Sequence, residues 1–115
     1  MAYNEQLTSK IRAALAHVSD VEEKKMFRGV AFMVNKKLCM SAGDHEIMCR
    51  IDPAIHDEVL NRTGCRTVVM NGRQYRGYVY VNEEAIATKK DFDFWIGLAL
   101  EFNKKAKASP RKKKP

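Results

Sequence analysis

Three short segments with alternating hydrophobicity constrain the fold most, because only short links separate them. The segment VAFMV at 30–34 is apolar on both sides, which is typical of an inner strand with cover on both faces. Further strands are predicted at 38–41 and 46–51, after turn candidates at Asn35–Lys36 and Gly43–Asp44. Extended segments joined by such short links pair as neighbours. The sequence therefore predicts an antiparallel meander.

Three helices are predicted around these strands. The first has Asn4 as its N-cap, ends near Ser19–Asp20, and presents one apolar stripe formed by Leu7, Ile11, Ala14, Leu15 and Val18. Asp52–Pro53 is a typical helix start, because Asp caps free amides and Pro fits the first turn. The last helix follows Thr88, whose spacing to Asp91 resembles a capping box.

Two more strands are predicted at 65–70 and 75–81, with a turn at Asn71–Gly72 between them. Residues 24–27 are expected to begin or extend the first strand, and Gly29 to mark a bulge or a close backbone approach. The predicted fold class is α+β: a two-layer domain with an antiparallel sheet and helices, in the order α-β-β-β-α-β-β-α. Its core is expected to contain Phe32, Ile47, Val79 and Trp95.

The charge of the chain is divided between a neutral body and a basic end. Residues 1–103 contain equal numbers of basic and acidic side chains, so the net charge of +7 lies wholly in residues 104–115. A neutral body has no general attraction to polyanions. From about Ala106 the chain also loses apolar content. We therefore predict a folded domain at 1–105 and a disordered basic tail at 106–115.

The basic tail is a candidate nucleic-acid-binding segment. Its sequence Ser-Pro-Arg-Lys at 109–112 matches a pattern of basic tails that lie in A·T-rich minor grooves. Such binding would be salt-sensitive and poor in sequence preference. The cations available for it are Lys104, Lys105, Lys107, Arg111, Lys112, Lys113 and Lys114. A solubilising tail is the alternative, and truncation after Phe102 is expected to leave the melting temperature nearly unchanged.

The number and spacing of the cysteines predict that they are reduced, structural thiols. Cys39, Cys49 and Cys65 are odd in number and form no CxxC pair, whereas zinc needs about four converging N or S ligands. None of the three histidines has a sequence context that would activate a thiol, and no glycine-rich phosphate loop occurs. We expect no cofactor, no metal and no enzymatic activity; a Cys-based metal or enzyme site is the weakest alternative.

Tyrosines on the predicted strand 75–81 form a further candidate surface. Tyr78 and Tyr80 share one side of this strand, with Arg73 and Arg76 nearby, and tyrosines can stack on nucleic-acid bases. Tyrosine in a strand is, however, commonly a half-buried sheet residue. This side of the strand is therefore where a site in the neutral body would be sought.

Several motifs together resemble the N-terminal domain of the TfoX/Sxy competence-regulator family, over about residues 3–103. They are a Y-N-x-x-L-x-x-x-I-R helix, an E-K-K-M-F segment before an apolar strand, a G-Y-V-Y-V strand and a Trp in the last helix. Here they are formed by Tyr3, Asn4, Leu7, Ile11, Arg12, Glu23 to Phe27, Gly77 to Val81 and Trp95. Arg28 replaces the first of two glycines usual in the family. The resemblance implies the two-layer α+β fold.

The resemblance also implies a function: a non-enzymatic regulatory or adaptor domain that binds a protein partner. Full-length regulators of the family carry a second, helical domain, in whose place we expect the basic tail. The alternative function is a nucleic-acid-associated protein acting through that tail. No apolar run is long enough to span a membrane and the N-terminus lacks a signal-peptide core, so we expect a cytoplasmic protein without membrane association. The partner's identity and a homodimer stay open.

Overall fold

Six strands form one antiparallel sheet with the spatial order β1-β2-β3-β4-β6-β5. The computed structural model describes residues 5–26 and 29–105. Its elements are α1 (Glu5–Ala14), β1 (Val21–Met26), β2 (Gly29–Val34), β3 (Lys37–Ala42), β4 (Glu46–Arg50), η1 (Pro53–Ile55), α2 (His56–Val59), β5 (Cys65–Met70), β6 (Arg73–Asn82), η2 (Glu83–Ile86) and α3 (Lys89–Asn103). None of the helices in these two ranges is long and apolar enough to cross a membrane.

The predicted α+β class, antiparallel sheet and element order are confirmed, with one additional strand. The sequence predicts residues 24–27 as the beginning of the strand that follows them. In the structure, Val21–Met26 is a strand of its own, β1, which pairs antiparallel with β2 along its whole length. Gly29 at the start of β2 lies so close to β3 that a Cβ there would sit 2.0 Å from the carbonyl oxygen of Ala42. The expected close backbone approach is therefore confirmed.

The two links of the predicted meander are tight turns. Asn35 and Lys36, between β2 and β3, both have positive φ angles, 54° and 65°. This is the backbone conformation of a type I′ turn, whose twist suits paired antiparallel strands. Between β3 and β4, the amide of Gly43 donates a 2.8 Å hydrogen bond to the carbonyl of Glu46. Both turns thus fix the register of the central strands.

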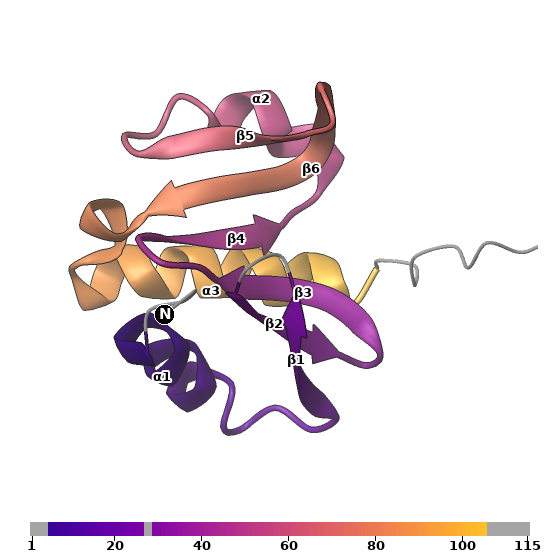
Figure 1. The fold of residues 1–115 in the computed structure, drawn as a ribbon, viewed down its shortest axis with the longest axis vertical. Helices are drawn as coiled ribbons and strands as arrows, with labels where there is room; N and C mark the ends of the chain where they lie inside the picture. Colours follow the sequence, from indigo (N-terminus) through magenta and orange to yellow (C-terminus); the bar gives the residue numbers. More distant parts are fainter. Residues whose placement is uncertain (1–4, 27–28, 106–115) are drawn as a thin grey trace, which may run out of the picture.

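The helices cover one face of the sheet, which confirms the two layers. In Figure 1, α3 crosses behind β3 and β4. The buried apolar side chains of the helices all belong to one main core cluster, together with side chains of β2, β3, β4 and β6. Trp95 of α3 is 2% exposed, and the side chains of Phe32, Ile47 and Val79 are fully buried, as predicted.

Helix capping follows the sequence signals at two of the predicted starts. The Asp52 carboxylate accepts a 2.9 Å hydrogen bond from the amide of Ala54 and caps η1, which leads into α2. The Thr88 hydroxyl accepts a 3.1 Å bond from the amide of Asp91 and caps α3. The predicted cap Asn4 lies outside the described residues.

The first helix ends earlier than predicted. α1 stops at Ala14 rather than near Ser19–Asp20. The chain must turn here to enter β1, and Asp20 adopts a positive φ of 58° at that turn. Leu15 and Val18, which follow α1, also pack against the main core. For this reason the apolar pattern of α1 continues beyond the end of the helix.

The last residue of α3 ties this helix to the β2–β3 turn. Asn103 is 3% exposed, and its side-chain amide donates a 3.2 Å hydrogen bond to the carbonyl of Val34. Its side-chain oxygen accepts a bond from Asn35 (3.3 Å), and its backbone carbonyl accepts one from Lys37 (2.6 Å). Truncation after Phe102 would remove all three bonds. We therefore expect that truncation to destabilise the domain, contrary to the expectation from sequence.

Candidate functional site

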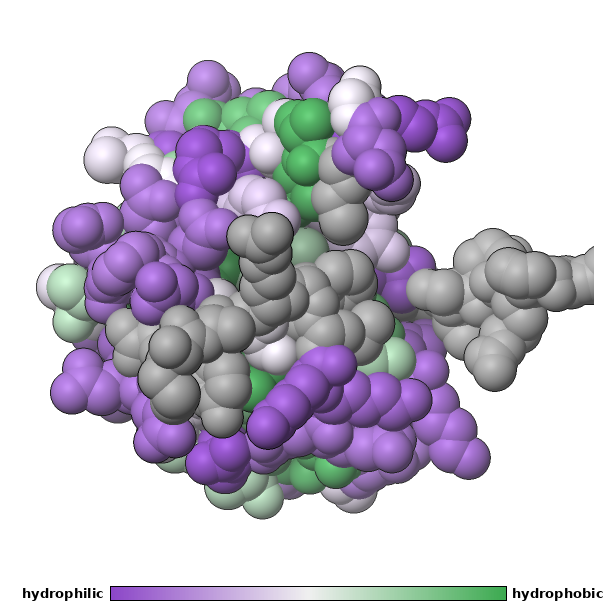
Figure 2. Space-filling model, in the orientation of Figure 1, coloured by the Kyte–Doolittle hydropathy of each residue, from purple (hydrophilic) through white to green (hydrophobic). Residues whose placement is uncertain are grey.

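The face of the sheet opposite the helices carries a second, smaller apolar cluster. All its members lie on strands: the buried Ala31, Leu38, Met48 and Val68, and the half-buried Met33, Tyr75, Tyr78 and Tyr80. We call this surface the helix-free face. Figure 2 looks onto it and shows apolar surface in its upper part, where Figure 1 places β5 and the β5–β6 turn, amid hydrophilic surroundings.

Tyr78 and Tyr80 share the helix-free face, as predicted, and each lies beside an arginine from a neighbouring strand. The guanidinium carbon of Arg50, on β4, is 5.6 Å from the ring centre of Tyr78. That of Arg66, on β5, is 5.2 Å from the ring centre of Tyr80. A cation at this distance from an aromatic ring is attracted to it. The rings are therefore engaged within the domain, which favours the half-buried structural interpretation over base stacking.

The arginines that the sequence placed near these tyrosines lie elsewhere. The Arg76 guanidinium pairs with the carboxylate of Asp57 in α2 at 3.2 Å. Arg73 is exposed at the start of β6. Neighbours along a strand point to alternate sides, whereas cross-strand neighbours lie side by side. Only the strand pairing could therefore reveal the partners of the tyrosines.

The two edges of the sheet differ in their chemistry. β1 has charged side chains at its four central positions, 22–25, and Glu23 accepts two hydrogen bonds from Arg12 of α1 (2.6 and 2.8 Å). β5 has a single charged residue, Arg66, which pairs with Glu46 of β4. Val69 of β5 is a large hydrophobic residue that is 50% exposed. Because proteins commonly protect free edges with charge, β5 is the less protected edge.

A bulge in β6 shapes the end of the helix-free face. The β5–β6 register shifts so that residues 76–78 of β6 have no opposite residue on β5. Gly77 at the centre of this bulge has a φ of 92°, which favours glycine. Its amide donates a 2.9 Å hydrogen bond to Nδ1 of His56, and its carbonyl accepts a 2.8 Å bond from the amide of Ile51. The bulge is thus held by α2 and by the end of β4.

His56 is a buried structural histidine. Because Nδ1 accepts from the Gly77 amide, the ring proton of the neutral form lies on Nε2, which is 2.9 Å from the hydroxyl of Thr67. Burial lowers the pKa of His56 below its usual value of 6.5, and the positive charge of Arg76 lowers it further, against the opposing effect of Asp57. The fold therefore selects neutral His56.

We expect the stability of the domain to fall as the pH falls through His56's unfolded pKa of about 6.5. Protonation favours the unfolded state, because the folded-state pKa is the lower of the two. Denaturant unfolding at about pH 7.5 and about pH 5.5 measures this loss. The variant His56→Gln should lose less stability over the same interval. An equal loss in both proteins would contradict the assignment.

The comparison with the variant is necessary because of His45. Protonation of His45 favours the folded state, whereas protonation of His56 favours the unfolded state. A hydrogen bond to Glu83 and the charge of Asp44 raise the pKa of this exposed histidine, so its favourable contacts strengthen on acidification. The wild-type pH dependence alone would combine the two histidines. Only the difference between wild type and His56→Gln reports on the buried ring.

The three thiols lie in or beside the main core. The β2–β3 register leaves Cys39 without an opposite residue, and this bulge directs both Cys39 and its neighbour Met40 into the core. Burial raises the pKa of Cys39 to about 12, that of Cys65 to about 11, and that of Cys49 well above its usual range. Protonated thiols are weak nucleophiles and weak metal ligands. In the described part of the chain, no three His, Cys, Asp or Glu side chains are grouped to hold a metal ion.

Two of the seven tail cations lie within the described residues. Lys105 pairs with Asp52 at 3.3 Å, and Lys104 is exposed. The others, Lys107, Arg111, Lys112, Lys113 and Lys114, lie outside the described residues. An exposed pair such as Lys105–Asp52 contributes little to stability, so Lys105 can exchange it for another anion. Nucleic-acid binding by the tail stays a prediction.

These features define an α+β domain with helices on one face of an antiparallel sheet and a second apolar cluster on the other. The family model of the TfoX N-terminal domain matches residues 13–103, and the chain belongs to this family. The family resemblance drawn from the sequence is therefore confirmed. Neither the curated proteins nor the solved structures contain a significant match to the chain.

Proposed function

We propose that the chain is a cytoplasmic, non-enzymatic regulatory or adaptor domain that binds a protein partner at the edge of β5. The observation that carries this proposal is the contrast between the charged edge β1 and the sparsely charged edge β5 with its exposed Val69. A free strand edge offers backbone donors and acceptors to an extended segment of another protein. Arg66 is already paired with Glu46, so the edge favours an uncharged, apolar segment.

Two further features support a binding role. The raised pKa values of the three thiols make them poor catalytic nucleophiles. The helix-free face adjoins the β5 edge, because Val68 of β5 and Tyr75 of β6 belong to its apolar cluster. A strand added to β5 would extend this face and gain apolar contacts beyond the backbone hydrogen bonds.

Site-specific crosslinking tests the proposed edge. A photoreactive amino acid at position 69 is expected to capture a partner in cells, which mass spectrometry then identifies. The same amino acid in place of Lys24, at the centre of β1, is the control for the opposite edge. A protein captured equally from both positions, or from neither, would contradict binding at β5.

Purified partner then allows a quantitative comparison. Val69→Lys should weaken binding at least about tenfold, because a charge on the edge strand opposes pairing with an apolar segment. Gln74→Lys is the matched control: Gln74 is exposed, neutral and directly opposite Val69, but lies on β6, one strand in from the β5 edge. Equal weakening by both variants would place the partner across the side of the sheet that carries Val69 and Gln74, opposite to Val68 and Tyr75, instead of at the edge.

The charge partition favours a second candidate function, nucleic-acid binding through the basic tail. All of the net charge of +7 lies in residues 104–115, beyond the last helix. Each phosphate contact made by a cation releases condensed counterions, which favours binding at low salt. The neutral body supplies no comparable attraction, so the interaction would depend on the tail.

If the tail binds duplex DNA, the slope of log K against log salt should not exceed about 6 in magnitude, because seven cations are available. Truncation after Lys105 removes five of them and should reduce the slope by up to about 4.5. This truncation keeps Asn103, so the melting temperature should change little. If the full chain does not bind DNA at low salt, the tail only solubilises the protein. If the truncated chain binds as well as the full chain, the binding site is in the body, and Tyr78 and Tyr80 are the place to look.

A further inference from the structure

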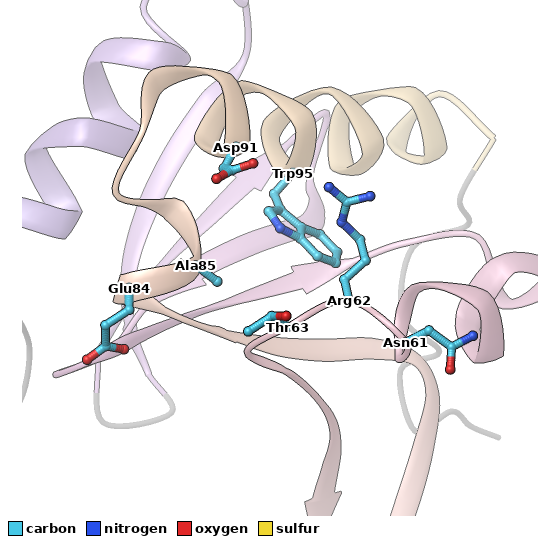
Figure 3. A pocket seen from close by; sticks show the side chains of 7 residues that line it. All are labelled: Asn61, Arg62, Thr63, Glu84, Ala85, Asp91 and Trp95. Carbon is cyan, nitrogen blue, oxygen red and sulfur yellow. The ribbon is translucent and has the colours of Figure 1, made fainter.

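A pocket of about 470 Å³ lies between the turn after α2, η2 and the first two turns of α3. It is lined by Asn61, Arg62, Thr63, Glu84, Ala85, Asp91 and Trp95. Figure 3 shows the Trp95 indole beside the Arg62 side chain, which reaches from the turn towards α3. Asp91 lies one turn before Trp95 on the same helix, and Glu84 extends from η2 on the side away from Arg62. The lining thus combines the largely buried Trp95 with groups of both charges.

Arg62 is positioned by an aromatic ring. Its guanidinium carbon lies 3.9 Å from the ring centre of Phe94, and the Phe94 ring packs edge-on against Trp95 at 5.2 Å. Such a cation–π contact orients the guanidinium group. The N–H donors, which lie in the plane of the guanidinium itself, stay available for hydrogen bonds. Within residues 5–26 and 29–105, no carboxylate lies within ion-pair distance of Arg62.

The carboxylates at the pocket differ from their neighbours in the chain. Asp93 pairs with Lys89 at 2.6 Å, and Glu83 pairs with His45 at 3.3 Å. Asp91 and Glu84, which line the pocket, form no ion pair in the described part of the chain. The pocket therefore presents one cation and two anions that form no ion pair with the described residues.

We propose that this pocket binds a small zwitterion of the amino-acid class, a free amino acid or a short peptide. Its carboxylate would bind the Arg62 guanidinium, which can offer two parallel N–H donors. Its ammonium group would bind Asp91, with Glu84 adding negative potential. Its side chain would lie along Ala85, next to the largely buried Trp95. The proposal is independent of partner binding at β5, because the two sites share no residue.

The chain contains a single tryptophan, so the fluorescence of Trp95 reports directly on the pocket. Titration of the full chain with L-leucine, L-phenylalanine and L-lysine is expected to give a saturable change in emission with at least one of them, with Kd below about 10 mM. The N-acetyl and the amide derivative of that amino acid each lack one charge. Both should bind at least about tenfold more weakly.

Variants test the two charged walls separately. Arg62→Gln and Asp91→Asn should each raise Kd at least about tenfold, whereas Arg73→Gln, which removes an exposed arginine away from the pocket, should leave Kd unchanged. Circular dichroism checks that each variant is folded. Absence of a saturable change with all three amino acids would overturn the proposal. Equal binding of the derivatives by the wild-type protein would also overturn it, whatever the variants do.

Discussion

Replacing Trp95 with alanine is expected to lower the free energy of unfolding by about 3–5 kcal/mol. The indole is 2% exposed and lies in the main core between α3 and the sheet. Its removal takes a large apolar area away from the core and leaves a cavity that the sheet cannot close. It also removes the edge-on contact with Phe94, whose ring supports Arg62. Denaturant unfolding followed by circular dichroism measures the change, since the variant has no tryptophan fluorescence.

Trp95→Phe is the matched variant for this prediction. Phenylalanine keeps an aromatic ring and most of the apolar volume, so the loss of stability should be clearly smaller than for alanine. Unchanged midpoints in both variants would mean that α3 does not rest on the sheet through Trp95. Because α3 is the longest helix and crosses β3 and β4, that result would contradict the two-layer arrangement itself.

The parts of the fold that sequence could predict depend on local chemistry. The type I′ turn at Asn35–Lys36 and the caps Asp52 and Thr88 are short-range signals, readable within four residues. The apolar run at 30–34 likewise identified an inner strand. These elements together are enough to determine an antiparallel meander flanked by helices.

Contacts that depend on strand register could not be predicted. β1 is an edge strand that reads EEKK at its centre, so it lacks the apolar alternation by which a strand is recognised. The pairing of Arg50 with Tyr78 and of Arg66 with Tyr80 crosses between strands that are distant in sequence. The bulge at 76–78 shifts the register itself.

The pocket beside Trp95 was invisible in the sequence for a related reason. Its walls come from three segments that no motif connects, and the Arg62–Phe94 contact joins residues of different elements. The basic tail, by contrast, was evident from composition alone, since its charges are contiguous. Contiguous features can be read from a sequence, whereas a surface assembled by folding cannot.

Gly29→Ala is expected to destabilise the domain by about 3 kcal/mol, a loss at the upper end for an added methyl group. The new Cβ would lie 2.0 Å from the carbonyl oxygen of Ala42 and 3.0 Å from its carbonyl carbon, and backbone atoms cannot rotate away. β2 and β3 would have to separate at this point, at the cost of their pairing. This explains why glycine is needed at position 29.

Gly97→Ala provides the matched control, because it adds the same methyl group where nothing lies within 4 Å. Gly97 is exposed in the middle of α3, and alanine there should stabilise the domain by up to about 1 kcal/mol through its higher helix propensity. Opposite shifts of the unfolding midpoint in the two variants are therefore expected. If Gly29→Ala were as stable as the wild type, β2 and β3 could not approach as closely as the structure shows, and the register of the central sheet would need revision.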